Sequence, residues 1–182
     1  KQGFSQADGG HLWAFIEESK IDIGQQTLLP NAYTAESKTL HIAGKKWMLT
    51  MATGHENDLD NHTLSLTYSL SDGTTPTVEI GTNELIIELG GANSPTTVGQ
   101  LKTALENHDA ISQAKTIDSL DAEIVPDNYN AANKSLYIAG KKMVLTMATG
   151  EEATFNSLKL DYELADGSGV SAVSYTHLRA HE

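Results

Sequence analysis

The sequence predicts an α+β fold that is mostly β, made of small antiparallel β modules in tandem, each with about five strands and one short helix. Three observations lead to this prediction. Residues 38–54 recur at residues 134–150 with only four of the seventeen positions changed. Several short segments alternate between apolar and polar residues, which is the period of a half-buried strand. One segment near residue 100 has the three- and four-residue apolar spacing of a helix.

The repeat also sets the predicted domain boundaries, because its two copies lie 96 positions apart. We expect residues 1–27 to be the end of a preceding repeat, 28–123 a complete module and 124–172 a truncated next module. The chain begins at Lys1 and not at Met, so we expect a fragment or a processed product. Residues 173–182 read like the translation of a transposase-type sequencing adapter, so we expect a non-native tail there.

The composition and net charge of the chain limit the kinds of binding partner that we expect. The net charge is -12 and the isoelectric point about 4.9, so a basic face for nucleic acid is not expected. The chain has no Cys, which excludes disulfides and thiol chemistry. No apolar run approaches the length of a membrane span. The expected partners are therefore neighbouring repeats of the same chain, with homo-oligomer formation as a further option.

The first copy of the repeat predicts a hairpin with strands at residues 39–43 and 46–53. Gly44-Lys45 is the predicted tight turn, because Gly readily adopts the positive φ of a two-residue loop. The second strand has apolar residues on both faces, which predicts a central strand covered on both sides. Its faces carry Trp47, Leu49 and Met51 on one side and Met48, Thr50 and Ala52 on the other.

Further strands follow the hairpin. Residues 63–70 show the clearest alternation in the chain and end at a turn, Asp72-Gly73. A second hairpin is predicted from residues 78–80 through a Gly81–Asn83 loop into 85–89. The inward set of the 63–70 strand is Leu64, Leu66, Tyr68 and Leu70.

A short helix is predicted to begin after Thr97 and to end near His108. Thr97 and Gln100 have the spacing of a capping box, in which side chain and backbone bond reciprocally. The segment from 111 to 123 is then expected to be a link to the next module. The apolar stripe of the helix is Val98, Leu101 and Leu105.

This layout resembles the tandem β-rich modules of phage tail and other virion structural proteins and of large bacterial surface proteins. The segments that carry the resemblance are Leu49 to Gly54, Leu64 to Gly73, Val78 to Leu89 and Thr97 to Asn107. The resemblance implies a structural role on a virion, outside the cell or at the cell surface. The resemblance identifies no catalytic residue in this sequence.

The loop between the predicted second and third strands holds the candidate metal ligands. Glu56, Asp58 and Asp60 are candidates for calcium, which takes six or more oxygen ligands. The spacing of an EF-hand is absent, and we favour a solvated acidic loop. His55 and His62 are candidates for a transition metal, but their spacing matches no ligand motif, and we favour surface histidines.

The remaining repeated residues have plain structural interpretations. Lys45-Lys46, repeated as Lys141-Lys142, is expected to solvate a hairpin tip and protect an edge. The repeated tyrosines, such as Tyr68, are expected to serve core or turn packing. No catalytic triad, carboxylate pair or phosphate loop stands out, so we predict no enzyme activity and no cofactor. The sequence thus predicts a spacer or scaffold segment, and the alternative is an extracellular carbohydrate- or calcium-binding adhesin module that uses the 54–62 loop.

Overall fold

The computed structural model describes residues 29–72, 75–146, 149, 159–164 and 170–174. The expected end of a preceding repeat, residues 1–27, lies outside these ranges, as does the expected tail from position 175 onward. The described residues are mostly β, with the helix α2 and several small sheets, as predicted for the fold class. The chain divides into two compact units, and one of them is Pro30–Pro126.

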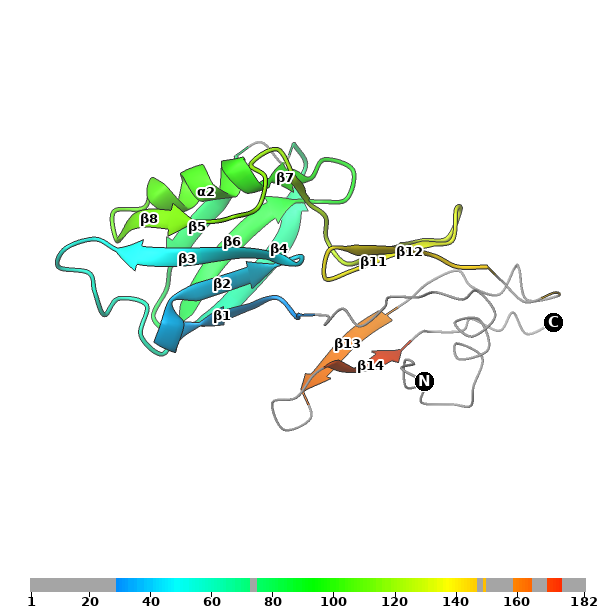
Figure 1. The fold of residues 1–182 in the computed structure, drawn as a ribbon, viewed down its shortest axis with the longest axis horizontal. Coiled ribbons are helices and arrows are strands. Elements are labelled where there is room, and N and C mark those ends of the chain that lie inside the picture. Colours follow the sequence, from blue (N-terminus) through cyan, green and yellow to red (C-terminus); the bar gives the residue numbers. More distant parts are fainter. Residues whose placement is uncertain (1–28, 73–74, 147–148, 150–158, 165–169, 175–182) are drawn as a thin grey trace. The chain divides into compact units, whose positions relative to one another are not determined.

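The first sheet of this unit is antiparallel and has the order β1-β2-β3-β8 (Figure 1). A single 3₁₀ turn, η1 (Ala35–Ser37), connects its first two strands. The strands are β1 (Ala32–Thr34), β2 (Thr39–Ile42), β3 (Lys45–Met51) and β8 (Ile111–Lys115).

The hairpin turn between β2 and β3 lies one residue earlier than predicted. Ile42 pairs with Lys45, so Ala43 and Gly44 form the two-residue loop. Both have positive φ, 47° at Ala43 and 72° at Gly44. Two consecutive positive φ values give the type I′ turn that suits the twist of a hairpin. The sequence suggested Gly44-Lys45 because alanine rarely adopts this conformation.

β3 is central, as predicted, but it is covered on one face only. Trp47 and Leu49 are buried on the inner face. Met48, on the outer face, keeps 50% of its surface exposed, and Lys46 and Thr50 are exposed beside it. The prediction of a doubly covered strand was wrong because it counted Met48 and Ala52 as core, although single apolar side chains are common on protein surfaces.

The second sheet has the order β4-β6-β5 and is mixed. β5 and β6 form the predicted antiparallel hairpin, but β4 pairs with β6 in parallel, which corrects the prediction of purely antiparallel modules. β6 lies at the centre because its inward side chains, Leu85, Ile87 and Leu89, are all fully buried. The strands are β4 (Thr63–Leu70), β5 (Thr77–Ile80) and β6 (Glu84–Gly90).

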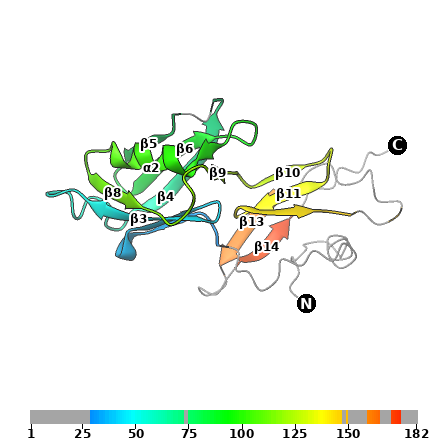
Figure 2. The ribbon, with the colours of Figure 1, turned by 45° about the horizontal axis from the view of Figure 1, so that its top comes forward.

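The helix α2 (Val98–Glu106) begins as the sequence predicts. The amide of Gln100 donates to Thr97 Oγ1 at 3.2 Å, and the amide of Thr97 donates to Gln100 Oε1 at 2.8 Å. This reciprocal pair satisfies two of the amides that a helix start leaves free. Figure 2 shows α2 lying over β5 and β6. Its predicted stripe, Val98, Leu101 and Leu105, is fully buried.

The segment after the helix is more than a link, which corrects the prediction for residues 111–123. Its first part is β8, and Ile111 and Ala114 of this strand are buried. Its end forms β9 (Glu123–Ile124), which pairs with β7 (Thr96–Thr97) next to the helix start. Between them, the carbonyls of Leu120 and Ala122 accept hydrogen bonds from the first amides of α2.

The core of Pro30–Pro126 lies between the two sheets and α2. Side chains from all three elements form one buried cluster, so burial of apolar surface joins them. The largest fully buried side chains of the unit are Trp47, Leu40, Ile42, Leu59, Leu85, Ile87, Leu89, Leu101, Leu105, Ile111 and Ile124.

Glu106 connects the end of α2 to β8. Its carboxylate accepts from Lys102 and from the amide of Ala114 at 3.0 Å, and these bonds hold the pKa of Glu106 below its ordinary value of 4.5. Because the carboxyl group has a lower pKa in the folded chain than in the unfolded chain, its ionised form stabilises the fold at pH values above the unfolded-state pKa. This stabilisation is lost as the pH falls through the folded-state pKa. We expect Glu106→Gln to cost about 1 kcal/mol at pH 7. Urea unfolding should show this loss shrinking toward pH 3, whereas Glu79→Gln, at an exposed position, should show none at either pH.

The second unit contains a three-stranded sheet in the order β10-β11-β12 and the antiparallel pair β13-β14. Val173 and Ser174, the first two residues of the expected non-native tail, lie in β14. The strands are β10 (Asn128–Asn130), β11 (Ser135–Ile138), β12 (Lys141–Val144), β13 (Lys159–Leu164) and β14 (Val170–Ser174).

The sheet β10-β11-β12 repeats the pairing of β1-β2-β3. Leu136 pairs with Tyr129 on one side and Met143 on the other, as Leu40 does with Tyr33 and Trp47. All three positions are displaced by 96 residues, so the register is the same in both sheets.

Backbone details recur at the same displacement. Lys38, Ala43 and Gly44 have positive φ, and so do Lys134, Ala139 and Gly140. The amide of Leu49 donates to the carbonyl of Lys38 at 2.8 Å, and that of Leu145 to Lys134 at 2.8 Å. A side-chain oxygen of Asn31 accepts from the amide of Ala43, and one of Asp127 accepts from Ala139.

Candidate functional site

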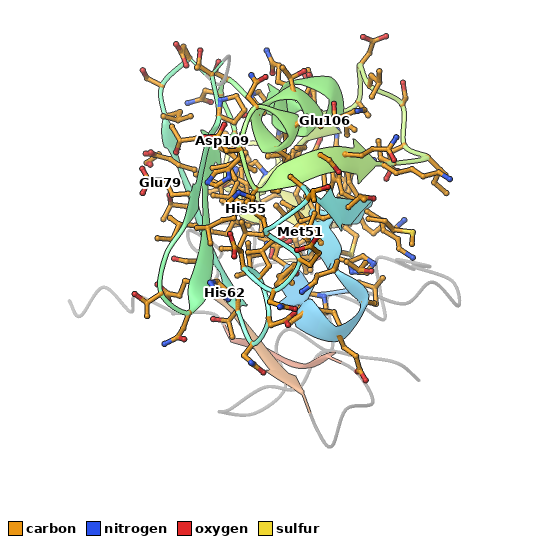
Figure 3. All side chains as sticks on the ribbon, turned by 90° about the vertical axis from the view of Figure 1, so that its left-hand side faces the viewer. Met51, His55, His62, Glu79, Glu106 and Asp109 are labelled. Atoms are coloured by element: carbon orange, nitrogen blue, oxygen red, sulfur yellow. The ribbon has the colours of Figure 1, made fainter. Side chains whose placement is uncertain are left out.

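The first candidate site is the acidic loop, which we define as residues 54–62 between β3 and β4. Figure 3 looks onto this part of the molecule and labels His55 and His62 in it. Three backbone turns shape the loop, and in each an amide donates to the carbonyl three residues earlier. The amide of His55 donates to Ala52, that of Asp58 to His55 and that of Asp60 to Asn57, each with an N···O distance of 3.0 Å.

The structure does not bring the three calcium candidates together. Both oxygens of the Glu56 carboxylate accept from the amide of Gly54 at 3.0 Å, and this bond lowers the pKa of Glu56. Asp58 pairs with His55, and Asp60 with Lys38. Each carboxylate thus has a partner of its own. In the described ranges, no group of three or more His, Asp or Glu side chains is arranged to hold a metal ion.

The two histidines of the loop have different roles. His55 is half-buried, and its Nδ1 lies 2.6 Å from Asp58 Oδ2. His62 is only 9% exposed, so the prediction of a surface histidine was wrong for it. Its Nδ1 lies 3.0 Å from the carbonyl oxygen of Asp60, and its Nε2 lies 2.9 Å from that of Gly81.

His62 therefore ties the acidic loop to the turn between β5 and β6. The buried side chain of Leu59, which is 0% exposed, anchors the middle of the same loop in the core. A carbonyl oxygen only accepts hydrogen bonds, so a neutral imidazole donates to one of the two and a protonated imidazole to both. These contacts give the ring a structural role.

We expect His62→Ala to lower the free energy of unfolding by about 1–3 kcal/mol, because it removes the ring's hydrogen bonds at a buried position. Urea denaturation of the 182-residue chain measures this change. His55→Ala is the matched control, since His55 is half-exposed in the same loop, and it should cost less than about 1 kcal/mol. Equal losses in the two variants would contradict the role assigned to His62.

The repeated lysines begin the second strand of each hairpin: Lys45 and Lys46 begin β3, and Lys141 and Lys142 begin β12. Lys46 pairs with His41 across the strands, and its amide donates to Asp118 Oδ2 at 2.9 Å. Partial burial, and then the charge of Lys46, lower the pKa of His41. In the second unit, Lys142 lies 5.9 Å from the ring centroid of Tyr137, the counterpart of His41. Lys46 and Lys142 thus each interact with the residue opposite them in the neighbouring strand.

Two of the repeated tyrosines pack in the core, as predicted. Tyr33 is buried, and burial followed by the charge of Asp60 raises its pKa to about 12. Tyr68 is partly buried against the same cluster, and its hydroxyl accepts from Asn31 at 3.5 Å. The side chain of Tyr162 lies outside the described part of the structure.

The second candidate site is a groove between β5 and α2, with a volume of about 690 Å³. The helix and its C-cap residue contribute Gln100, Thr103, Ala104 and Asn107. Val78 of β5 and the two residues before this strand also line the groove, as do Leu120 and Asp121. We refer to it below as the β5–α2 groove. It is lined by Thr75, Pro76, Val78, Thr97, Gly99, Gln100, Thr103, Ala104, Asn107, His108, Leu120 and Asp121.

The β5–α2 groove was not among the sites predicted from the sequence. One signal for it was present: Gln100, Thr103 and Asn107 lie at i, i+3 and i+7 on the helix, opposite the buried stripe. A polar helix face is usually solvated, so the pattern does not by itself indicate a groove. Only the placement of β5 beside α2 creates one.

Within the described part of the chain, no helix has both the length and the apolar character needed to cross a membrane. No family model matches the chain, and comparisons with curated proteins and with solved structures find no match either.

Proposed function

We propose that the chain is a non-catalytic structural segment of a phage virion protein, such as a tail or fibre, or of a bacterial surface protein. In it, β-rich modules repeated along the chain act as a spacer or scaffold. The observation that carries the proposal is the recurrence of one local structure 96 residues further on. The register of three strands, the turn conformation, one backbone hydrogen bond and one hydrogen bond from a backbone amide to a side-chain oxygen all recur.

The positions that differ between the copies keep their character, which supports the same function. Met48 and its counterpart Val144 are 50% and 59% exposed, whereas the pairs Trp47/Met143 and Thr39/Ser135 are buried in both copies and stay apolar and hydroxyl-bearing, respectively. What the copies share is therefore backbone conformation and packing, which a structural array requires. A shared catalytic site would need shared polar clusters. The partners of such modules are neighbouring repeats and, in an oligomer, copies of the same chain.

Recovery of the complete reading frame from the source DNA tests this proposal. We expect further copies of the repeat on either side, together with a domain for virion assembly or surface attachment. A reading frame with no further copy and a catalytic domain would contradict it. Turnover by the purified 182-residue chain on a broad panel of hydrolase substrates, lost when the fold is denatured, would contradict the absence of catalysis.

One observation favours a second candidate, an extracellular calcium- or carbohydrate-binding adhesin module. Glu56, Asp58 and Asp60 are all exposed within one short loop. Hard cations such as calcium prefer carboxylate oxygens, and a loop could rearrange around one. A rise in the unfolding temperature on addition of calcium, abolished in Asp58→Asn, supports this candidate. An unchanged unfolding temperature with calcium and with a glycan panel eliminates it.

A further inference from the structure

The β5–α2 groove borders the edge strand β5 at Val78 and at the two residues before the strand, Thr75 and Pro76. β5 is the last strand of the order β4-β6-β5 among the described residues. The opposite edge, β4, lies next to β1, where Asn31 donates to the hydroxyl of Tyr68. The two edges of this sheet thus differ: one faces a neighbouring strand, and the other faces the groove.

The phase of the β5-β6 ladder shows which groups of β5 face this edge. The amide of Gly81 donates to the carbonyl of Glu84 at 2.8 Å, so these two residues form a hydrogen-bonded pair. In an antiparallel ladder such pairs alternate with non-bonded ones. Glu79 and Thr77 therefore bond to β6, and the backbone amides and carbonyls of Val78 and Ile80 point toward the free edge. An added strand finds donors and acceptors there.

The dimensions of the groove suit an extended peptide. α2 has nine residues, so its wall is about 13 Å long. Four or five residues of an extended chain span about 13–17 Å. Ala104 has a small side chain at the centre of the helix wall, which leaves room for the side chains of a bound strand. Asn107 has an exposed side-chain amide that offers a donor and an acceptor to a peptide backbone, and the amide nitrogen of Gln100, whose Oε1 accepts from Thr97, offers donors.

The charge around the groove selects the kind of peptide. Asp121 lines it, Glu79 is exposed on β5, and the chain as a whole carries a net charge of -12. We propose that the β5–α2 groove binds an extended peptide segment of another protein that carries Lys or Arg, by adding it as a strand to β5. Backbone pairing supplies affinity in this mode, and the side-chain pockets supply selectivity. A second copy of this chain would bring another acidic surface to the same edge, which charge repulsion opposes.

The test is an NMR titration of the ¹⁵N-labelled 182-residue chain with a capped hexapeptide of alternating Lys and Val. We expect shifts at the amides of Val78 and Ile80 and at the side-chain amides of Gln100 and Asn107. The same peptide with Glu in place of Lys should bind at least fivefold more weakly. Asp121→Asn should reduce the preference for the Lys peptide over the Glu peptide.

Two variants address the groove itself. Ala104→Arg fills it with a long cationic side chain and should weaken binding of the Lys peptide at least tenfold. Ala92→Arg is the matched control at an exposed turn outside the groove, and its effect should be less than twofold. Val78→Pro removes one amide from the free edge and should also weaken binding. If circular dichroism shows that Val78→Pro does not fold, the comparison of Ala104→Arg with Ala92→Arg decides whether the peptide binds in the groove.

Three results would overturn the proposal. They are the absence of any shift at millimolar peptide, equal binding of the Lys and Glu peptides, and unchanged binding to Ala104→Arg. Sedimentation showing a dimer that Ala104→Arg dissociates would assign the groove to a second copy, and would also overturn it. The proposal stands apart from the structural function, because repeats in the full reading frame are compatible with either outcome.

Discussion

Replacing Trp47 by alanine should lower the free energy of unfolding by about 3–5 kcal/mol. Trp47 is fully buried on the inner face of β3, beside Leu40 of β2, and belongs to the cluster that joins both sheets and α2. Its removal takes away a large apolar surface and leaves a cavity that the closely packed neighbours fill only in part. Urea denaturation followed by far-UV circular dichroism measures the loss.

Trp47→Met is the informative comparison, because methionine stands at the corresponding position, Met143, in the second unit. Methionine is flexible and apolar and fills irregular space, so Trp47→Met should cost less than Trp47→Ala. The control Met48→Ala changes the exposed outer face of the same strand and should cost less than about 1 kcal/mol. A loss below about 1 kcal/mol for Trp47→Ala would place Trp47 outside the core.

Replacing Leu59 by alanine should cost about 2–5 kcal/mol, although Leu59 lies in a loop. Its side chain is 0% exposed and belongs to the main core cluster. The same change should free the acidic loop, so limited proteolysis should cut within residues 54–62 faster than in the unmodified chain. Urea denaturation gives the stability, and mass spectrometry of the fragments locates the cut.

Asn57→Ala is the matched control for this prediction, because Asn57 is exposed two residues away in the same loop. It should alter the stability by less than about 0.5 kcal/mol. If the two variants lose equal stability, or if the loop resists proteolysis in Leu59→Ala, then Leu59 does not anchor the loop.

The parts of the fold that local signals encode were predictable. The capping box at Thr97 and the stripe at Val98, Leu101 and Leu105 mark the helix within a few residues of sequence, and the helix forms there. Pairing between distant segments was not predictable. The alternation in residues 63–70 identifies a strand but does not show that it pairs in parallel with β6. Strand β8 was not predicted, because its only buried residues, Ile111 and Ala114, are three positions apart and do not give the alternation of buried and exposed residues that marks a strand.

The candidate sites could also be predicted only in part, because they depend on contacts between segments that are distant in sequence. The sequence placed Glu56, Asp58 and Asp60 in one loop, but their different partners depend on the conformation of that loop and on Lys38, which is distant in sequence. His62 is buried where its ring contacts the carbonyl oxygen of Gly81, which comes 19 residues later in the sequence. The β5–α2 groove depends on how a strand and a helix pack, which no local pattern encodes.

We propose that residues from 124 onward begin a second copy of the module formed by residues 28–123. Asp166-Gly167 corresponds to Asp72-Gly73, so fusing residues 74–123 after Gly167 completes that copy. Mechanical unfolding of this extended chain by atomic force microscopy shows whether the second copy folds as a unit of the same size. We expect two unfolding events with nearly equal length increments of about 300 Å, the reach of roughly 96 residues less the folded dimension. A single event of that length, or two clearly unequal ones, would contradict it.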